Sequence, residues 1–240
     1  MIQSTKILKP IWPQAKNIHA FTTLKGCKIN DLNLPNNQFR IQQEHGIKIL
    51  NATINTLDTP IADGSYTMQK NLVCVVKTAD CLPILVSSLQ GDFVAAIHAG
   101  WRGLANGIIN NFFNQIKQLN IVLSDLLFWL GPAIGPLAFE VGDDVLSKFN
   151  YDLALNQNHE NKPKIYNSNS FGSAFKNTNK PNKYLANIYQ LTKINLYQLG
   201  INDSQIFSEN WCTYLQDDLF YSYRRDPQND NRMYSLIWIN

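Results

Sequence analysis

The stretch "IHAGWRGLANGII" (residues 97–109) decides the fold, because it joins an apolar strand to an amphipathic helix through a glycine. After Gly100, apolar side chains recur at four-residue spacing, which predicts a helix from about residue 102 to residue 119. This helix would bury one face, formed by Leu104, Ile108, Phe112 and Ile116. Histidine, tryptophan and arginine beside the glycine indicate a ligand nearby, since the free N–H groups of a helix start attract anions.

Short apolar runs on both sides of this junction predict a protein rich in strands. Their β-branched residues favour buried strands, which are expected at 46–54, 72–78, 83–89, 93–99 and 126–130. Later in the chain we expect strands at 203–209, 219–225 and 232–239, and helices at 139–149 and 183–199. Because strands outnumber helices and do not alternate with them, the pattern favours an α+β fold with helices outside layers of strands.

Length and composition indicate one folded domain over residues 1–240. Apolar residues make up 45% of the chain and charged residues 16%, which excludes a disordered protein. The segment from 156 to 183 is polar and rich in Asn and Lys. We expect a long, flexible loop there, either a lid or an insertion.

Charge and hydropathy narrow the classes of partner. The formal net charge of +3 is too small to indicate binding to nucleic acid or to an acidic membrane. No apolar run approaches the roughly 18 residues of a membrane span, and the first residues lack the apolar core of a signal peptide. We therefore expect a cytoplasmic protein, a monomer or weak homo-oligomer, that acts on a small molecule.

Three side chains stand at predicted strand ends, each close to a turn or a glycine: His45, Cys81 and His98. Strand ends of one sheet meet at one edge, so two imidazoles and a thiolate there would make a three-ligand zinc site with an open fourth position. Such a position holds and acidifies a water molecule. The alternative is that both histidines make ordinary hydrogen bonds and that the cysteine is buried and inert.

Arginines supply candidates for an anion site. Arg102 lies at the start of the predicted helix, where its guanidinium and the free N–H groups would face one point. Arg224 and Arg225 are a second candidate, and the alternative for them is a surface ion pair with Asp226. The aromatic residues just before them either stack on a flat base or belong to the core of a strand; they are Phe220, Tyr221 and Tyr223.

Several motifs together resemble one known family. They are "ADGSYT" (62–67), "TADCLPILV" (78–86), "IHAGWRGLANGII" (97–109), "GPAIGPLAFEVGDDV" (131–145), "CTYLQDDLFYSYRRD" (212–226) and "RMYSLIWI" (232–239). These motifs are similar to those of the YfiH-type laccase-domain family, whose members are named polyphenol oxidase, purine nucleoside phosphorylase and peptidoglycan editing factor. The resemblance extends from about residue 18 to the C-terminus.

The resemblance implies a layered α-β-β-α sandwich with mixed sheets, related to a group of proposed cysteine hydrolases. It also implies a zinc site on the histidine of a Gln-x-His-Gly motif, here residues 43–46, and on the cysteine and histidine of the two motifs that follow. In this chain those ligands are His45, Cys81 and His98. The chain departs from the family at Leu24, where an arginine is usual, and at Asn187, where an aspartate is common.

The function that the resemblance implies is zinc-dependent chemistry on purine nucleosides, with phosphate as co-substrate. The reactions are phosphorolysis of adenosine, inosine, guanosine or methylthioadenosine, and deamination of adenosine. Phosphorolysis needs phosphate held while positive charge develops on the sugar, and the three arginines named above are the expected substrate-binding residues. Deamination needs a carboxylate that moves protons, and Asp80 is the nearest one in sequence. Catalytic roles are thus expected for His45, Asp80, Cys81 and His98.

Three other functions would use the same residues. In a cysteine hydrolase that edits peptidoglycan precursors, Cys81 would be the nucleophile and a histidine the base. In a copper polyphenol oxidase, the three ligands would imitate a blue-copper centre, but the chain has only four histidines, and neither Met68 nor Met233 is an obvious axial ligand. In a binding protein without activity, the metal would be structural and closed by a fourth protein ligand.

Overall fold

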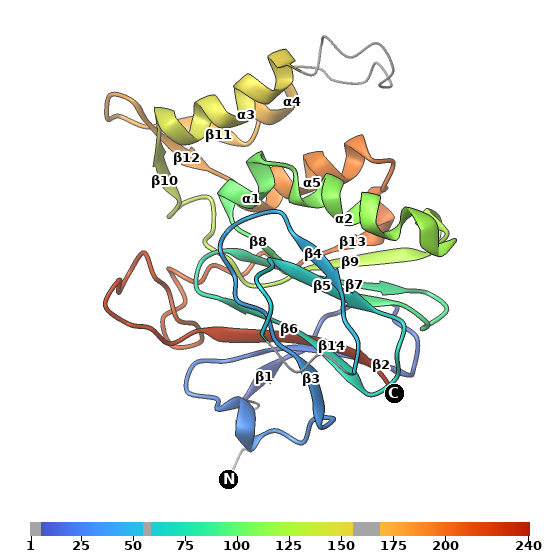
Figure 1. The fold of residues 1–240 in the computed structure, drawn as a ribbon. Helices are drawn as coiled ribbons and strands as arrows, with labels where there is room; N and C mark the ends of the chain where they lie inside the picture. Colours follow the sequence, from blue (N-terminus) through green and yellow to red (C-terminus); the bar gives the residue numbers. More distant parts are fainter. Residues whose placement is uncertain (1–5, 55–58, 156–168) are drawn as a thin grey trace.

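Two stacked sheets with helices on one outer face form the centre of the molecule (Figure 1). A computed structural model describes residues 6–54, 59–155 and 169–240 of the chain. Within these residues, the larger sheet has six strands in the order β13-β9-β7-β8-β5-β4. They are β4 (Ile49–Asn51), β5 (Gly64–Thr67), β7 (Leu82–Ser88), β8 (Val94–Ala99), β9 (Leu126–Leu130) and β13 (Ile206–Phe207).

The second sheet has five strands among the described residues, in the order β1-β2-β14-β6-β3. They are β1 (Ile7–Leu8), β2 (Ile18–Thr23), β3 (Asn37–Phe39), β6 (Leu72–Thr78) and β14 (Met233–Ile239). The last strand in sequence, β14, lies in the middle and pairs antiparallel with both β2 and β6. Both sheets are mixed, because β3 runs parallel to β6 and β4 runs parallel to β5.

Alternating side chains divide the strands of the larger sheet between two cores, as the period of two in a strand requires. On β7, Ile84 and Val86 belong to the core beneath the helices, whereas Leu85 faces the second sheet. Trp129 of β9 is fully buried in this inter-sheet core, and its indole Nε1 donates a hydrogen bond to Glu209 (2.9 Å). The larger sheet is therefore covered on both faces, which explains its almost continuously apolar strands.

Helices α1 (Trp101–Ala105), α2 (Ile108–Ile116) and α5 (Ile188–Gln198) cover the outer face of the larger sheet (Figure 1). The predicted apolar face is buried, but the single helix expected from residue 102 to residue 119 is wrong. Gly107 adopts a left-handed conformation (φ 89°) that separates α1 from α2. After α2, residues 117–119 continue as a short 3₁₀ helix.

A small third sheet stands beside these helices, in the order β10-β12-β11. Its strands are β10 (Glu140–Gly142), β11 (Phe175–Asn177) and β12 (Lys183–Ala186), and α3 (Asp143–Leu155) and α4 (Asn169–Gly172) accompany it. The helix expected at 183–199 therefore begins later, after its first residues pair as β12. The loop expected at 156–183 is replaced from residue 169 by α4 and β11, and residues 156–168 lie outside the described residues.

The outer face of the second sheet carries no α-helix among the described residues. It is covered by the segment after β2, which includes a 3₁₀ helix (Ile29–Asp31) and packs on Phe21, Val75 and Trp238. Further 3₁₀ helices cover Leu123–Asp125 and Asp203–Gln205. The α+β class with mixed sheets is confirmed.

The strand expected at 219–225 is wrong, because this segment consists of turns. The neighbouring expectations hold: β13 lies within 203–209, and β14 within 232–239. Among the helices that the structure describes, none has the length and apolar character needed to cross a bilayer.

Candidate active site

His45, Cys81 and His98 come together at one edge of the larger sheet. His45 precedes β4, Cys81 directly precedes β7, and His98 is the penultimate residue of β8. One nitrogen from each imidazole and the sulfur all lie within 4.8 Å of one another. The two imidazole rings meet edge to face, with centroids 4.8 Å apart. The structure thus brings together the three residues that the sequence selected as metal ligands.

The charges of this cluster depend on one another. Burial by itself would raise the pKa of Cys81, but the positive charge of His98 and hydrogen bonds from both imidazoles outweigh it and lower that pKa. For His98, burial would lower the pKa, yet the Cys81 thiolate and the Asp63 carboxylate raise it above its ordinary value. Without a metal, the cluster therefore favours a thiolate beside an imidazolium.

Gly100 is the residue that gives the cluster its space. A Cβ at this position would lie 3.1 Å from the sulfur of Cys81 and 3.1 Å from Cδ2 of His45. Gly100 is also the N-cap of α1, so the helix starts directly beside the cluster. However, α1 has only five residues, so the long helix expected from residue 102 to residue 119 does not continue behind this N-terminus.

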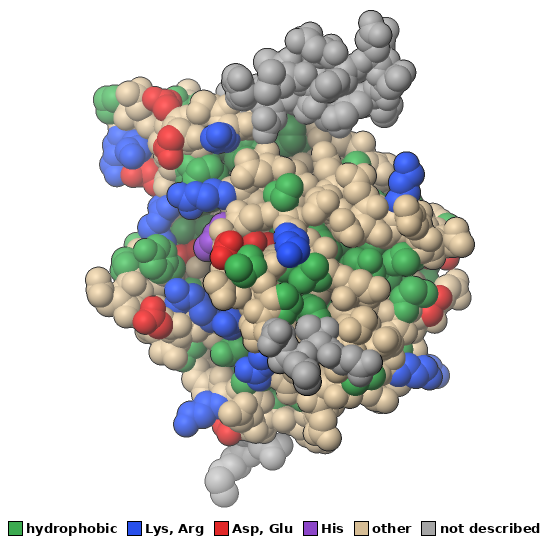
Figure 2. Space-filling view, in the orientation of Figure 1, with side chains coloured by type: hydrophobic (Ala, Val, Ile, Leu, Met, Phe, Trp, Pro, Cys, Tyr) green, Lys and Arg blue, Asp and Glu red, His purple; other side chains and the backbone are tan. Residues whose placement is uncertain are grey.

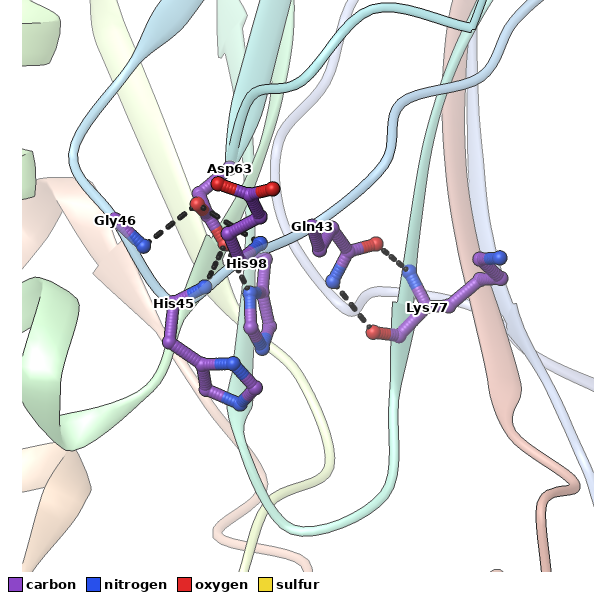
Figure 3. Close-up of polar contacts among 7 residues, drawn as sticks. Gln43, His45, Gly46, Asp63, Lys77 and His98 are labelled. Carbon is purple, nitrogen blue, oxygen red and sulfur yellow. Dashed lines mark hydrogen bonds and ion pairs between the residues drawn. The ribbon is translucent and has the colours of Figure 1, made fainter.

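Two residues that the sequence did not select as site residues hold the ligand loops in place (Figure 3). The Asp63 carboxylate accepts hydrogen bonds from the backbone of the His45 loop and from the His98 ring. Burial alone would raise the pKa of Asp63, but the hydrogen bonds from His98 and from the backbone of Gly46 and Glu44 hold it below its usual range. The Gln43 amide pairs with both backbone groups of Lys77. Both residues lie in motifs named in the sequence analysis: Asp63 in "ADGSYT" (62–67) and Gln43 in the Gln-x-His-Gly motif (43–46).

A cavity of about 960 Å³ opens onto the cluster. Arg102, Arg224, Lys77 and Arg232 line it and outnumber its two acidic residues, Asp80 and Asp230, so its wall is basic on balance. Its apolar lining includes Trp101, Ile134, Phe139 and Ile188. Figure 2 shows a histidine on this face of the molecule, with Lys and Arg side chains on either side of it.

The expected substrate residues take different places. Arg102 is exposed, with its guanidinium 4.4 Å from the centroid of the Trp101 ring. Arg224 reaches from the 212–226 segment and donates to the Glu140 carbonyl (2.9 Å). Arg225 is not a lining residue: its guanidinium donates to three carbonyls, those of Thr213, Tyr214 and Phe220.

The aromatic residues before these arginines also separate. Phe220 is fully buried, whereas Tyr223 is 55% exposed and lines the cavity. Tyr221 is half-buried, and its hydroxyl accepts a hydrogen bond from the backbone of Gly26. Of the three, only Tyr223 is placed to contact a ligand in the cavity.

Asp80 lies beside Cys81 but faces the 212–226 segment. Its carboxylate accepts hydrogen bonds from the hydroxyls of Thr213 (2.6 Å) and Ser222 (3.0 Å) and from the backbone N–H of Arg224 (2.6 Å). Its backbone is left-handed, with φ 88°. These contacts tie the loop that carries Cys81 to the segment that carries Arg224.

The other histidines, cysteines and methionines that the structure describes lie outside the cluster of His45, Cys81 and His98. Cys74 is buried inside β6, Cys212 accepts a hydrogen bond from the backbone of Gly135, and the His19 ring stacks on Trp238. His159 lies outside the described residues. Within the described part of the chain, the metal-ligand cluster has no fourth histidine, cysteine or carboxylate, and no methionine lines the cavity.

Known proteins resemble this chain over nearly its whole length. A purine nucleoside phosphorylase of Haemophilus influenzae is 35% identical over 261 residues, covering 96% of this chain and 98% of the relative. The purine nucleoside phosphorylase YfiH of Escherichia coli K12 is 34% identical and covers 98% of this chain and 99% of the relative. A crystal structure of a Neisseria meningitidis protein superimposes with a TM-score of 0.82 at 30% identity, covering 98% and 99% of the two chains.

A family model also matches most of the chain. The model described as multi-copper polyphenol oxidoreductase laccase matches residues 27–240. A crystal structure of YfiH from Bacillus licheniformis has the same fold, with a TM-score of 0.78 at 24% identity and 93% of each chain covered. The chain therefore belongs to the multi-copper polyphenol oxidoreductase laccase family, the YfiH-type laccase-domain family that its motifs resemble.

Proposed function

We propose that the chain is a purine nucleoside phosphorylase whose cavity holds a nucleoside and phosphate beside a metal on His45, Cys81 and His98. One observation carries the proposal: the three ligand atoms lie within 4.8 Å of one another and open onto a basic cavity. The curated relatives with this name support it, because they match the chain over nearly its full length.

The donor set fits zinc. Two imidazoles and a thiolate are ligands that zinc prefers, and three protein ligands leave a fourth position open, as in catalytic sites. The lowered pKa of Cys81 favours the thiolate that a metal needs. When bound, zinc supplies a Lewis acid that polarises a substrate group or acidifies a water.

The lining residues account for the binding of both substrates. Phosphorolysis joins a phosphate oxygen to C1′ of the sugar while the bond from C1′ to the base breaks and its electrons leave with the base. The guanidinium groups of Arg102 and Arg224 supply the positive charge that holds phosphate. The rings of Trp101, Phe139 and Tyr223 supply apolar surface for a purine.

Asp80 has a setting that favours anchoring over proton transfer. Three donors occupy its oxygens, so it holds Arg224 beside the cavity. This observation favours phosphorolysis, which needs bound phosphate, over deamination, which needs a free carboxylate to shuttle protons.

The test is an assay of the purified protein with zinc, phosphate and adenosine. We expect adenine and ribose 1-phosphate, and we expect Cys81→Ala to abolish their formation. Cys27→Ala is the matched control, because Cys27 does not line the cavity. Chromatography separates the reactions, since deamination yields inosine and ammonia. Adenosine left intact by wild type, or a Cys81→Ala variant as active as wild type, would refute the proposal.

A cysteine hydrolase acting on peptidoglycan precursors is the second candidate. The lowered pKa of Cys81 beside His98 favours it, because a thiolate–imidazolium pair is a competent nucleophile. An acyl group trapped on Cys81 with a precursor would support this candidate. A copper polyphenol oxidase has less support, since the described lining residues include no methionine that could be the axial ligand of a blue-copper centre.

We also infer that residues 1–240 form one domain of the α-β-β-α type, related to cysteine hydrolases. The helices over one sheet and the two stacked sheets support this assignment. In this chain, the fourth layer would be the segment around Ile29–Asp31. We retain the expectation of a cytoplasmic monomer or weak homo-oligomer.

A further inference from the structure

Asp63 is a buried carboxylate that contacts both histidines of the cluster. Its residue is 1% exposed and directly precedes β5. One oxygen, Oδ1, accepts from the His45 backbone N–H (2.9 Å) and from Nδ1 of His98 (2.8 Å). The other, Oδ2, accepts from the backbone N–H groups of Gly46 (2.7 Å) and Glu44 (3.3 Å). Figure 3 shows the two histidines on the same side of this carboxylate.

The His45 loop depends on these contacts. His45 has a left-handed backbone (φ 60°), which is unfavourable for a residue with a Cβ. Three consecutive N–H groups point at one carboxylate and offset this cost, as in an anion-binding nest. Gln43 adds a second anchor, since its amide donates to the Lys77 carbonyl (2.8 Å) and accepts from the Lys77 N–H (2.7 Å).

The His98 ring depends on the same carboxylate. Nδ1 is engaged with Asp63, so Nε2 is the nitrogen left for a ligand. The backbone N–H of His98 also donates to the Asp63 carbonyl (2.7 Å). In the described part of the chain, the ion pairs include no Lys or Arg partner for Asp63, so its charge is met by the His98 ring and by the backbone N–H groups of residues 44–46.

From this geometry we propose that Asp63 is a positioning residue that orients His45 and His98 together, so that both present a nitrogen to one metal ion. The proposal rests on the metal site of the proposed function. Carboxylates that hold metal-binding histidines commonly contribute about 10- to 100-fold to metal affinity. Here one carboxylate serves two ligands, so its loss would disturb both at once.

The variant that tests this role is Asp63→Asn. An amide keeps the shape of the side chain. In the wild type both carboxylate oxygens accept from N–H groups, so the NH₂ group of the asparagine would replace one acceptor and face N–H donors. Asp92→Asn is the matched control: Asp92 accepts from the Ser88 hydroxyl (2.6 Å) in the turn at the other end of β8. It removes a hydrogen-bonded carboxylate without touching the cluster.

The readouts are zinc affinity, by competition with a chromophoric chelator, and the absorption spectrum of the cobalt-substituted protein. We expect Asp63→Asn to bind zinc about 10- to 100-fold more weakly and to change the cobalt spectrum, and Asp92→Asn to match wild type. Wild-type affinity and spectrum in a folded Asp63→Asn variant would overturn the proposal. If wild type itself bound no zinc, the proposed metal site and this role would both fall.

These measurements use no nucleoside, so they are independent of whether the protein phosphorolyses adenosine. A second measurement, on zinc-loaded wild type, decides the matter if Asp63→Asn does not fold. Nitrogen NMR of labelled histidines should show His98 protonated at Nδ1 and metal-bound through Nε2. Metal bound through Nδ1 of His98 would overturn the proposal, because Asp63 could not then hold that ring nitrogen.

Discussion

At the scale of single residues, the cysteines of this chain differ in charge because they differ in surroundings. Cys81 lies between two imidazoles, and their interactions with the sulfur overcome the effect of burial and lower its pKa. Burial inside β6 raises the pKa of Cys74 to about 12, and burial also raises that of Cys27. Of these three cysteines, Cys81 alone is therefore set up to be a thiolate at neutral pH.

Alkylation of the metal-free protein tests this difference. Iodoacetamide should modify Cys81 faster than Cys27 at about pH 7, because the thiolate is the reactive form. A lowered pKa means that the thiolate of Cys81 is lost only at acidic pH, so its rate should change little on going from neutral to mildly alkaline solution, whereas the rate of Cys27 should rise. Peptide mass spectrometry measures both rates. Zinc should protect Cys81 alone, and faster modification of Cys27 would contradict the expectation.

At the scale of elements, the start of α1 matters because it approaches the cluster without a side chain. His98 lies near the end of β8, and α1 begins directly after Gly100. Because Gly100 has no side chain, this start of α1 can pack closely against Cys81 and His45. Gly103 also allows α1 to lie close to the His45 loop, because a Cβ at residue 103 would lie 3.0 Å from the carbonyl oxygen of Gly46. Both glycines allow the helix to pack directly on the ligand loops.

Gly100→Ala should therefore weaken metal binding while the fold persists. The added methyl group would lie 3.1 Å from the Cys81 sulfur, so the sulfur and the His45 ring must shift. We expect zinc affinity to fall by at least about tenfold, in line with other disturbances of ligand orientation. Gly172→Ala is the control, since a Cβ there meets nothing within 4 Å. Chelator competition and circular dichroism measure affinity and fold, and unchanged affinity in Gly100→Ala would contradict this account.

The sequence predicted the buried strands best. The bounds of β6 and β9 agree with the expected ranges, 72–78 and 126–130, because buried strands are short and rich in β-branched or apolar residues. The helical expectations failed where local geometry or pairing prevailed. Gly107 divides one predicted helix, and β12 forms because residues 183–186 pair on both sides with other strands.

The site was predicted in part, for a physical reason. Strand ends at one edge brought the three ligands together, and this relation follows from topology. Asp63 lies in the quoted motif "ADGSYT", but its role was missed because that role depends on hydrogen bonds to residues 17 to 35 positions away. Arg224 and Arg225 are adjacent in sequence, yet only the first lines the cavity, because the second binds carbonyls of its own segment.

At the scale of the whole molecule, Asp80 connects parts of the chain that are far apart in sequence. Its contacts with Thr213, Ser222 and Arg224 span 133 to 144 positions. The hydroxyl donors can turn to satisfy another partner, but the Arg224 N–H cannot. The carboxylate thus fixes the position of the 212–226 segment against the larger sheet.

Asp80→Ala should reduce the free energy of unfolding by about 3 kcal/mol, because three hydrogen bonds to a charged acceptor are lost. It should also raise KM for phosphate, since the backbone N–H of Arg224 loses its acceptor. Asp218→Ala, at an exposed position away from the cavity, is the control. Urea denaturation and steady-state kinetics measure the two effects. A loss of kcat at wild-type stability and KM would instead identify Asp80 as a proton shuttle.

The central place of β14 has a consequence for how the molecule is made. A ribosome releases β2 and β6 long before β14, yet these two strands are joined only through it. Until then, each presents an open edge to other nascent chains, which is the situation that promotes aggregation. Tyr223 and Arg224, which line the cavity, lie shortly before β14 in sequence, so this part of the cavity and the second sheet can form only after both segments have been synthesised.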